Sequence, residues 1–135
     1  MHTIYIATTN PGKLREFREA AESLAVELEP LPGLETLPPA IEDGSTFEEN
    51  ARIKAEYYSR LLPTAMVVAE DSGLSVDQLG GAPGVHSARY AAMLGGGQAM
   101  HQNSQDEENN RVLVSQLERL PVGKIAGKYV CTIAA

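Results

Sequence analysis

Apolar and polar residues follow one another at spacings that predict alternating strands and helices. Residues 4–7 form a short β-branched and aromatic run that is typical of a strand. Asn10 and Pro11 then suit the N-cap and the first position of a helix. The apolar positions that follow at helical spacing are Leu14, Phe17, Ala21 and Leu24. The chain therefore begins with a predicted strand, a tight loop and a helix.

A second helix is predicted after residues 30–45, whose prolines and glycines are typical of a loop. Thr46 and Glu49 have the spacing of a capping box, in which each side chain bonds the backbone amide of the other residue. Pro63 ends the helix because it lacks the amide that a further turn needs. The apolar stripe of this helix consists of Phe47, Ala51, Ala55, Tyr58 and Leu62.

A continuous apolar run at residues 65–69 predicts a buried central strand. We expect this strand to end in the polar residues 70–73. Residues 74–77 alternate between apolar and polar side chains, which predicts a further short strand. A glycine-rich loop follows at residues 80–84.

The last predicted elements are a helix and a strand. Residues 91–104 are rich in glycine, methionine and glutamine, which predicts a mobile loop. Ser104 and Glu107 have capping-box spacing, so a helix is expected from Ser104. The sequence stops within a predicted strand at residues 129–133, and we expect a piece of a longer protein. The whole pattern, over residues 1–135, predicts a single α/β domain.

Composition narrows the class of protein. The chain has 135 residues and a formal net charge of −7, which disfavours nucleic-acid binding, because phosphate backbones are met by an excess of Lys and Arg. Its single cysteine excludes a disulfide framework and a cysteine-rich zinc site. No apolar run approaches the length of about 18 residues that crosses a bilayer, and the N-terminus does not look like a signal peptide. We therefore expect a soluble cytoplasmic protein.

The loop at residues 8–13 is the first candidate site. At the start of a helix, unpaired backbone amides and the helix dipole favour an anion. Thr8, Thr9 and Asn10 add side-chain donors, and Lys13 adds a full positive charge. The spacing of a Walker A loop is absent. The alternative is an ordinary capped helix with a solvated lysine.

Two adjacent acids, Glu70 and Asp71, form the second candidate site. They follow an apolar strand, where α/β sheets place their ligands. Their carboxylates repel each other unless a cation lies between them, and magnesium prefers such oxygen ligands. A carboxylate can also deprotonate an attacking water. The alternative is a polar turn in which Ser72 and Gly73 are the turn residues.

The second helix carries the third candidate. Asn50 and Lys54 are four residues apart, so they share one face of the helix. Glu42 and Asp43 lie shortly before the helix. These side chains could point along the edge of the core toward a site. The alternative is an amphipathic helix laced with surface ion pairs.

The fourth candidate is the turn-rich segment at residues 79–90. Pro83 and Gly84 predict a turn, and Ser87 is placed to cap a helical turn that carries Arg89. An arginine suits a phosphate or a carboxylate partner. The alternative is a surface turn with an exposed arginine.

The four candidates occur in an order that is specific to one family. The motifs in turn are Thr-x-Asn-x-x-Lys, Glu-x-Gly-x-Thr-Phe-x-x-Asn-Ala-x-x-Lys-Ala, Glu-Asp-Ser-Gly-Leu and Gly-Ala-Pro-Gly-x-x-Ser-Ala-Arg-Tyr. This order closely resembles the inosine/xanthosine triphosphate pyrophosphatase family over residues 4–133. The resemblance implies a mixed, elongated and twisted sheet flanked by helices, with two lobes and a central cleft.

The resemblance also implies a role for each candidate residue. Asp71 would accept the proton of the attacking water, and Arg89 would support the cleft or a dimer surface. Magnesium would be bound by Glu42 and Asp71, helped by Glu70. The residues that would bind the substrate are Thr8, Thr9, Asn10, Pro11, Gly12, Lys13, Lys54 and Ser72.

Members of this family use magnesium to hydrolyse ITP, dITP and XTP to the monophosphate and pyrophosphate, and homodimers are usual. The aromatic-Gly-Tyr-Asp-Pro and Ser-His-Arg segments with which the family reads the base do not occur in this sequence. The resemblance therefore implies a C-terminally incomplete chain. Two alternatives stay open. One is a truncated, non-catalytic module that binds nucleotide or dimerises, and the other is a pyrophosphatase for other nucleotides.

Overall fold

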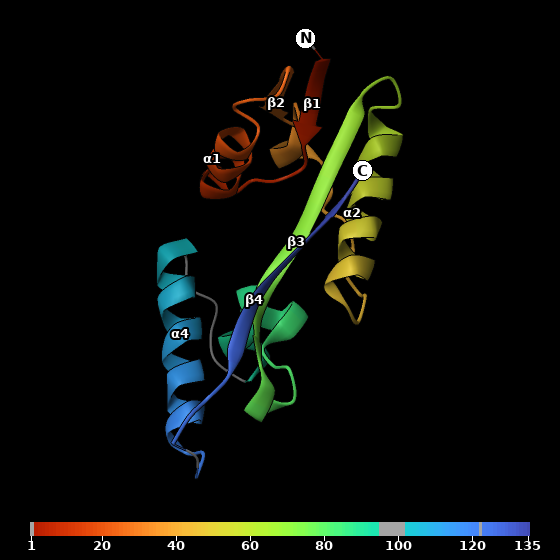
Figure 1. The fold of residues 1–135 in the computed structure, drawn as a ribbon. Coiled ribbons are helices and arrows are strands. Elements are labelled where there is room, and N and C mark those ends of the chain that lie inside the picture. The colour runs from red at the N-terminus through yellow and green to blue at the C-terminus, as the bar shows by residue number, and fades with distance from the viewer. Residues whose placement is uncertain (1, 95–101, 122) are drawn as a thin grey trace. The chain divides into compact units, whose positions relative to one another are not determined.

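The computed structural model describes residues 2–94, 102–121 and 123–135 (Figure 1). Its helices and strands are β1 (His2–Ile6), α1 (Pro11–Ala20), β2 (Val26–Pro30), α2 (Phe47–Leu61), β3 (Met66–Val76), α3 (Tyr90–Met93), α4 (Gln102–Glu118) and β4 (Gly127–Ala134). Short 3-10 helices lie at Leu34–Thr36, Asp77–Leu79 and Gly84–Arg89.

The strands of the described part of the chain form one sheet in the order β2-β1-β3-β4. β1 lies in the middle of a parallel group, because it pairs in parallel with both β2 and β3. Ile6, the last residue of β1, lies opposite Val68 of β3. The predicted α/β sheet flanked by helices is therefore confirmed.

β4 runs back along β3, which makes the sheet a mixed one. The amide of Asp77 donates to the carbonyl of Ala126 at 2.9 Å, just before β4 begins. Further along, the hydroxyl of Tyr129 lies 3.1 Å from that of Ser72. From the first contact to the second, the residue number increases along β4 and decreases along β3. The two strands are therefore antiparallel. The predicted strand at residues 129–133 is confirmed within β4.

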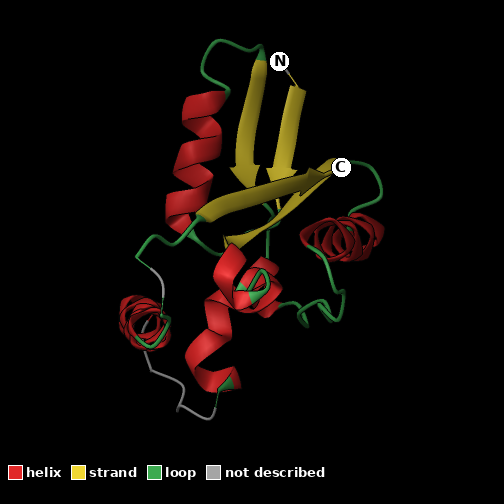
Figure 2. Cartoon of the chain, turned by 60° about the horizontal axis from the view of Figure 1, so that its bottom comes forward, coloured by secondary structure: helices red, strands yellow, loops and turns green. Residues whose placement is uncertain are grey.

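The chain divides into two compact units, Met1–Asp71 with Thr132–Ala135, and Ser72–Cys131. Two units agree with the two expected lobes. In the first unit α1 and α2 lie on opposite sides of the strands (Figures 1 and 2). Its core consists of Ala7, Leu31, Ala40, Ala55, Tyr58, Val67 and Ala69. The core of the second unit consists of Val76, Tyr90 and Leu113.

The first difference from the sequence prediction is β2. α1 ends at Ala20, so Leu24 lies beyond the helix and is 60% exposed instead of belonging to its apolar stripe. The chain then forms a strand at Val26–Pro30, where none was predicted. Leu28 is the residue of this strand that reaches the core. The parallel pairing with β1 stabilises a segment that is too short to form a strand by itself.

The second difference lies in β3, which runs without a break from Met66 to Val76. The sequence predicted an end at residues 70–73 and a separate strand at residues 74–77. Gly73 is buried in the middle of this strand. A Cβ atom at Gly73 would lie 2.8 Å from the Gly84 carbonyl oxygen and closer still to Ser87 Oγ. Gly73 is therefore required by close packing and not by a turn.

Ser87 fills the space beside Gly73, and it does not cap the helical turn as predicted. Its hydroxyl accepts from the amide of Leu74 at 3.0 Å and donates to the carbonyl of Gly84 at 2.6 Å. The hydroxyl thus satisfies a backbone amide of β3. This bond ties β3 to the 3-10 helix Gly84–Arg89 within the second unit.

Replacing Gly73 by alanine is expected to destabilise the chain by about 1–3 kcal/mol, the usual cost of overpacking a filled site. The added methyl group must displace Ser87 or the backbone at Gly84. Gly123→Ala is the matched control, because a Cβ atom there meets nothing within 4 Å. Urea unfolding of both variants measures the difference. Equal midpoints for Gly73→Ala and the wild type would show that β3 has room at this position.

The third difference is the start of α4. The helix begins at Gln102, so Ser104 lies inside it and not at its N-cap. Half of the predicted mobile loop, residues 95–101, lies outside the described residues, whereas residues 91–93 belong to α3 and residues 102–104 to α4, so the loop prediction is wrong there. Within the described ranges, none of the helices combines the length and the apolarity that a membrane span needs.

Candidate active site

The loop between β1 and α1 is closed around Asn10. As the N-cap of α1, Asn10 accepts through Oδ1 from the amides of Gly12 at 2.9 Å and Lys13 at 3.3 Å. The amide of Asn10 itself donates to Thr8 Oγ1 at 3.1 Å. Three amides of the predicted anion site therefore already have partners. An anion here would be bound chiefly by side-chain donors, the Lys13 ammonium and the helix dipole.

The same loop forms one wall of a hollow of about 410 Å³. Residues 30–36, which the sequence predicted only as part of a loop, form the opposite wall. From the predicted phosphate-binding loop, the lining residues are Thr8, Thr9, Asn10 and Pro11. A volume of this size lies within the range of about 300–1,000 Å³ that small-molecule sites occupy.

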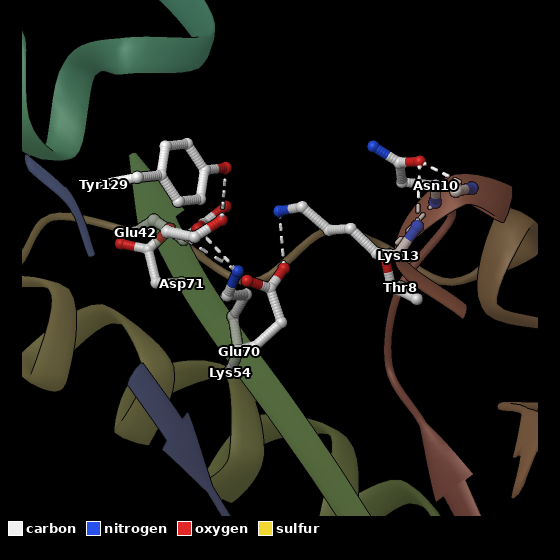
Figure 3. A network of polar contacts seen from close by, with 10 residues as sticks. Thr8, Asn10, Lys13, Glu42, Lys54, Glu70, Asp71 and Tyr129 are labelled. Atoms are coloured by element: carbon white, nitrogen blue, oxygen red, sulfur yellow. Dashed lines mark hydrogen bonds and ion pairs between the residues drawn. The ribbon is translucent and has the colours of Figure 1, made fainter. Parts of the chain in front are cut away.

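Lys13 is held by a buried carboxylate. Its Nζ atom lies 2.5 Å from Oε1 of Glu70, whose side chain is 4% exposed (Figure 3). Glu70 lies in β3 beyond the point where β1 ends, because Ile6 is paired with Val68. The acid therefore lies beyond the carboxyl end of β1, whereas the sequence predicted it at the end of its own strand, which continues to Val76.

Lys54 contacts the other two predicted acids. Its Nζ atom lies 3.1 Å from Oε1 of Glu42 and 3.8 Å from Oδ1 of Asp71. The side chains of Lys54 and Asp71 are 15% and 13% exposed, whereas that of Glu42 is 34% exposed. Lys54 is therefore a shared cation for two carboxylates (Figure 3). That the helix face of Lys54 points toward a substrate site stays a prediction.

Of these acids, Asp71 has the negative charge that its surroundings neutralise least. Its second oxygen, Oδ2, is buried and has no hydrogen-bond partner. Burial raises the pKa of the Asp71 carboxyl, and the Lys54 ammonium and the Asn50 amide lower it without cancelling that effect. The negative charges of Glu42 and Glu70 raise the pKa further. Asp71 would thus gain from an additional cation.

Magnesium fits these residues in kind. Carboxylate oxygens are its preferred protein ligands, and the buried Asp71 Oδ2 lacks a partner. No group of three or more acid, histidine or cysteine side chains in the described ranges is gathered closely enough to hold a metal ion. The acids are instead paired with lysines. A magnesium site at Glu42, Asp71 and Glu70 stays a prediction, and forming it requires the two lysines to give up these partners.

Two predicted residues belong to the second unit. The Ser72 hydroxyl lies 3.1 Å from the Tyr129 hydroxyl. Arg89 is exposed at the end of the 3-10 helix Gly84–Arg89. These contacts do not test what the two residues do. The predicted substrate role of Ser72 and the supporting role of Arg89 therefore stay predictions.

Asn50 has a closer connection to the candidate site than its predicted place on a helix face implied. It is 3% exposed, and its Oδ1 atom accepts from the amide of Gly44 at 2.8 Å. The signal in the sequence was its spacing of four residues from Lys54, on the same face of α2. The wall formed by residues 30–36 carried no comparable signal, since its prolines and glycine indicated only a loop.

Comparison with known proteins identifies the family. A sequence profile of the Ham1 family matches residues 4–135. The chain is 48% identical over 134 residues to a dITP/XTP pyrophosphatase of Acidobacterium capsulatum, and the match covers 98% of this chain and 64% of that relative. It is 42% identical to a dITP/XTP pyrophosphatase of Geobacillus kaustophilus, with 99% and 61% covered. The chain thus spans less than two thirds of the length of these relatives.

Comparison with solved structures points to the same family. The solved structure of a HAM1 protein from Coxiella burnetii superimposes with a TM-score of 0.78 at 33% identity, and the match covers 98% of this chain and 62% of that one. The resemblance seen in the ordered motifs is confirmed by both comparisons. The chain belongs to the Ham1 family.

Proposed function

We propose that this chain carries the metal- and phosphate-binding part of a nucleoside triphosphate pyrophosphatase that uses magnesium to hydrolyse ITP, dITP and XTP. The observation that carries the proposal is the pairing of Lys13 with Glu70, and of Lys54 with Glu42 and Asp71, in one compact unit. The name dITP/XTP pyrophosphatase, which the relatives bear, supports the substrate class.

The charges of these residues suit a complex of metal and nucleotide. A triphosphate carries up to about four negative charges, which an acidic protein must neutralise locally. Lys13 and Lys54 supply positive charge, and the start of α1 adds its dipole. The acids Glu42, Glu70 and Asp71 would hold the magnesium ion. The same lysines that now neutralise the acids would then bind phosphate oxygens.

In the proposed reaction a water oxygen forms a bond to the α-phosphorus. The bond from this phosphorus to the bridging oxygen breaks, so that pyrophosphate leaves with the electron pair and the monophosphate remains. Asp71 accepts the proton that the water loses. Bound magnesium supplies neutralisation of phosphate charge and a lower pKa for water. Thr8, Thr9 and Asn10 orient the phosphate chain through their side-chain donors.

The remaining parts of the proposal rest on the family resemblance. Pro11 and Gly12 shape the start of α1 around the phosphates, and Ser72 contacts the substrate. We propose that the protein acts in the cytoplasm as a homodimer, like the usual members of the family. A small-molecule nucleotide is the proposed partner.

The test measures pyrophosphate release by the purified chain, and by a full-length protein that contains it, from dITP, ITP, XTP, ATP and GTP, with and without magnesium. We expect magnesium-dependent release from the three deaminated purine nucleotides by a full-length protein that contains this chain, and weak or unselective release by the chain alone, because the segments with which the family reads the base do not occur in its sequence. Binding of a non-hydrolysable ITP analogue without turnover would favour the non-catalytic module instead. Equal rates of the full-length protein with all five nucleotides would favour the less selective pyrophosphatase. A full-length protein that contains this chain and neither binds nor hydrolyses any of them would contradict the proposal.

A further inference from the structure

Asn50 joins two parts of the candidate active site. It lies in the first turns of α2, one helical turn before Lys54. Its Oδ1 atom accepts from the amide of Gly44, in the segment that follows Glu42. A buried polar side chain is costly unless it is hydrogen-bonded, and Asn50 is 3% exposed. The bond to Gly44 therefore fastens residues 42–44 to the helix that carries Lys54.

The contact at Gly44 is tight. A Cβ atom on this residue would lie 2.7 Å from Asn50 Oδ1 and 2.7 Å from the Cβ atom of Glu49. No side chain fits between the segment and the helix at this point. The backbone of residues 42–44 is thus set at a fixed distance from α2, and Glu42 is set with it.

The Asn50 amide favours the charged form of the Asp71 carboxyl and so lowers its pKa. The Asn50 Oδ1 atom itself is occupied by the amide of Gly44. Lys54, on the same face of α2, contacts both Glu42 and Asp71. One face of α2 therefore contacts the Glu42 carboxylate through Lys54 and the backbone that follows Glu42 through Asn50.

We propose that Asn50 is a positioning residue, which holds residues 42–44 against α2 in the arrangement in which Glu42 and Asp71 face one divalent cation. This inference rests on the proposed function, because it assigns the cation to the magnesium of that reaction. Asn50 acts through the segment that carries Glu42 and does not touch the substrate. Residues that orient metal ligands in this way typically change metal affinity or activity by about 10- to 100-fold when they are removed.

The experiment compares Asn50→Ala with Tyr58→Phe. Tyr58 lies on the same helix, is 7% exposed, and its hydroxyl accepts from the amide of Ala40 at 3.3 Å. Both variants therefore remove one hydrogen bond between α2 and the segment before it, but only the bond of Asn50 fastens residues 42–44. Calorimetric titration with magnesium alone gives the metal affinity of each variant. We expect a loss of about 10- to 100-fold for Asn50→Ala and none for Tyr58→Phe.

A second readout separates positioning from a general loss of structure. For Asn50→Ala we expect kcat for dITP to fall by about 10- to 100-fold with little change in KM, because Lys13 and the start of α1 still bind the phosphates. If Asn50→Ala does not fold, Gly44→Ala perturbs the same contact from the other side. For Gly44→Ala we also expect lower magnesium affinity and a lower kcat.

The outcomes for the inference and for the proposed function differ. A wild-type chain that binds magnesium and releases pyrophosphate, with Asn50→Ala as active and as tight for the metal as Tyr58→Phe, overturns the inference alone. Equal losses in both variants also overturn it, because the role of Asn50 is then only structural. A wild-type chain that neither binds magnesium nor hydrolyses nucleotide overturns the proposed function and the inference with it.

Discussion

Replacing Asp71 by asparagine is expected to reduce pyrophosphate release from dITP by about 10²- to 10⁴-fold, the usual contribution of a positioned acid or base. The same change is expected to stabilise the metal-free chain. The asparagine side chain has nearly the same shape, but it removes a buried negative charge whose Oδ2 atom has no hydrogen-bond partner. Lys54 would keep its ion pair with Glu42 at 3.1 Å. Activity and stability should thus change in opposite directions.

The gain in stability should depend on pH. Burial raises the pKa of Asp71 in the folded chain above its ordinary value of 3.8. The wild-type carboxyl therefore favours folding most below pH 3.8, and it loses this contribution as the pH rises through the raised pKa. Asp71→Asn has no such loss. Its advantage in melting temperature over the wild type should be small in acid and larger at neutral pH.

Thermal unfolding without magnesium, measured for both proteins from acid to neutral pH, tests this expectation. A variant that is less stable than the wild type at neutral pH would show that Lys54 compensates Asp71 more strongly than burial penalises it. Pyrophosphate release by Asp71→Asn at the wild-type rate would remove Asp71 from the role of proton acceptor.

The sequence predicted best those features that depend on neighbouring residues. Asn10 caps α1 and Thr46 caps α2, with the amide of Glu49 bonded to Thr46 Oγ1 at 3.1 Å. Even here one partner differs, since the Glu49 carboxylate accepts from the amide of Ser45 and not from that of Thr46. Such bonds span only a few residues, so side-chain type and spacing largely determine them.

Features that depend on distant residues were predicted less well. β2 has the alternation of a strand, with Leu28 between two glutamates, but its partner β1 is what makes it one. Gly73 suggested a turn because glycine is common in turns. The reason for glycine there is Ser87, which is distant in sequence and close in space. A local pattern does not contain that contact.

The candidate site shows the same division. The five charged residues were each selected from the sequence, but their pairing was not. We expected magnesium to relieve the repulsion between Glu70 and Asp71, whereas in the structure each acid contacts a different lysine. That pairing depends on the register of β1 against β3 and on the face of α2 that is turned toward the sheet. Both are tertiary features.

Replacing Lys54 by methionine is expected to destabilise the metal-free chain and to strengthen its binding of magnesium alone. Lys54 is the shared cation of Glu42 and Asp71. Removing one partner of a fully buried ion pair costs about 3–5 kcal/mol, and the partial exposure of Glu42 reduces the expected loss to about 1–3 kcal/mol. The two uncompensated carboxylates should then attract a divalent cation more strongly. Nucleotide binding should weaken, because a phosphate ligand is lost.

Arg52→Met is the matched control for this experiment. Arg52 lies on the same helix and pairs with Glu48 at 3.2 Å, but both side chains are about two-thirds exposed, at 69% and 66%. An exposed pair of this kind contributes about 0–1 kcal/mol. Urea unfolding and calorimetry with magnesium, then with a non-hydrolysable ITP analogue, measure both variants. If Lys54→Met binds magnesium no more tightly than Arg52→Met does, then Lys54 does not compete with the metal for these acids, and the proposed exchange of the lysine from carboxylate to phosphate is wrong.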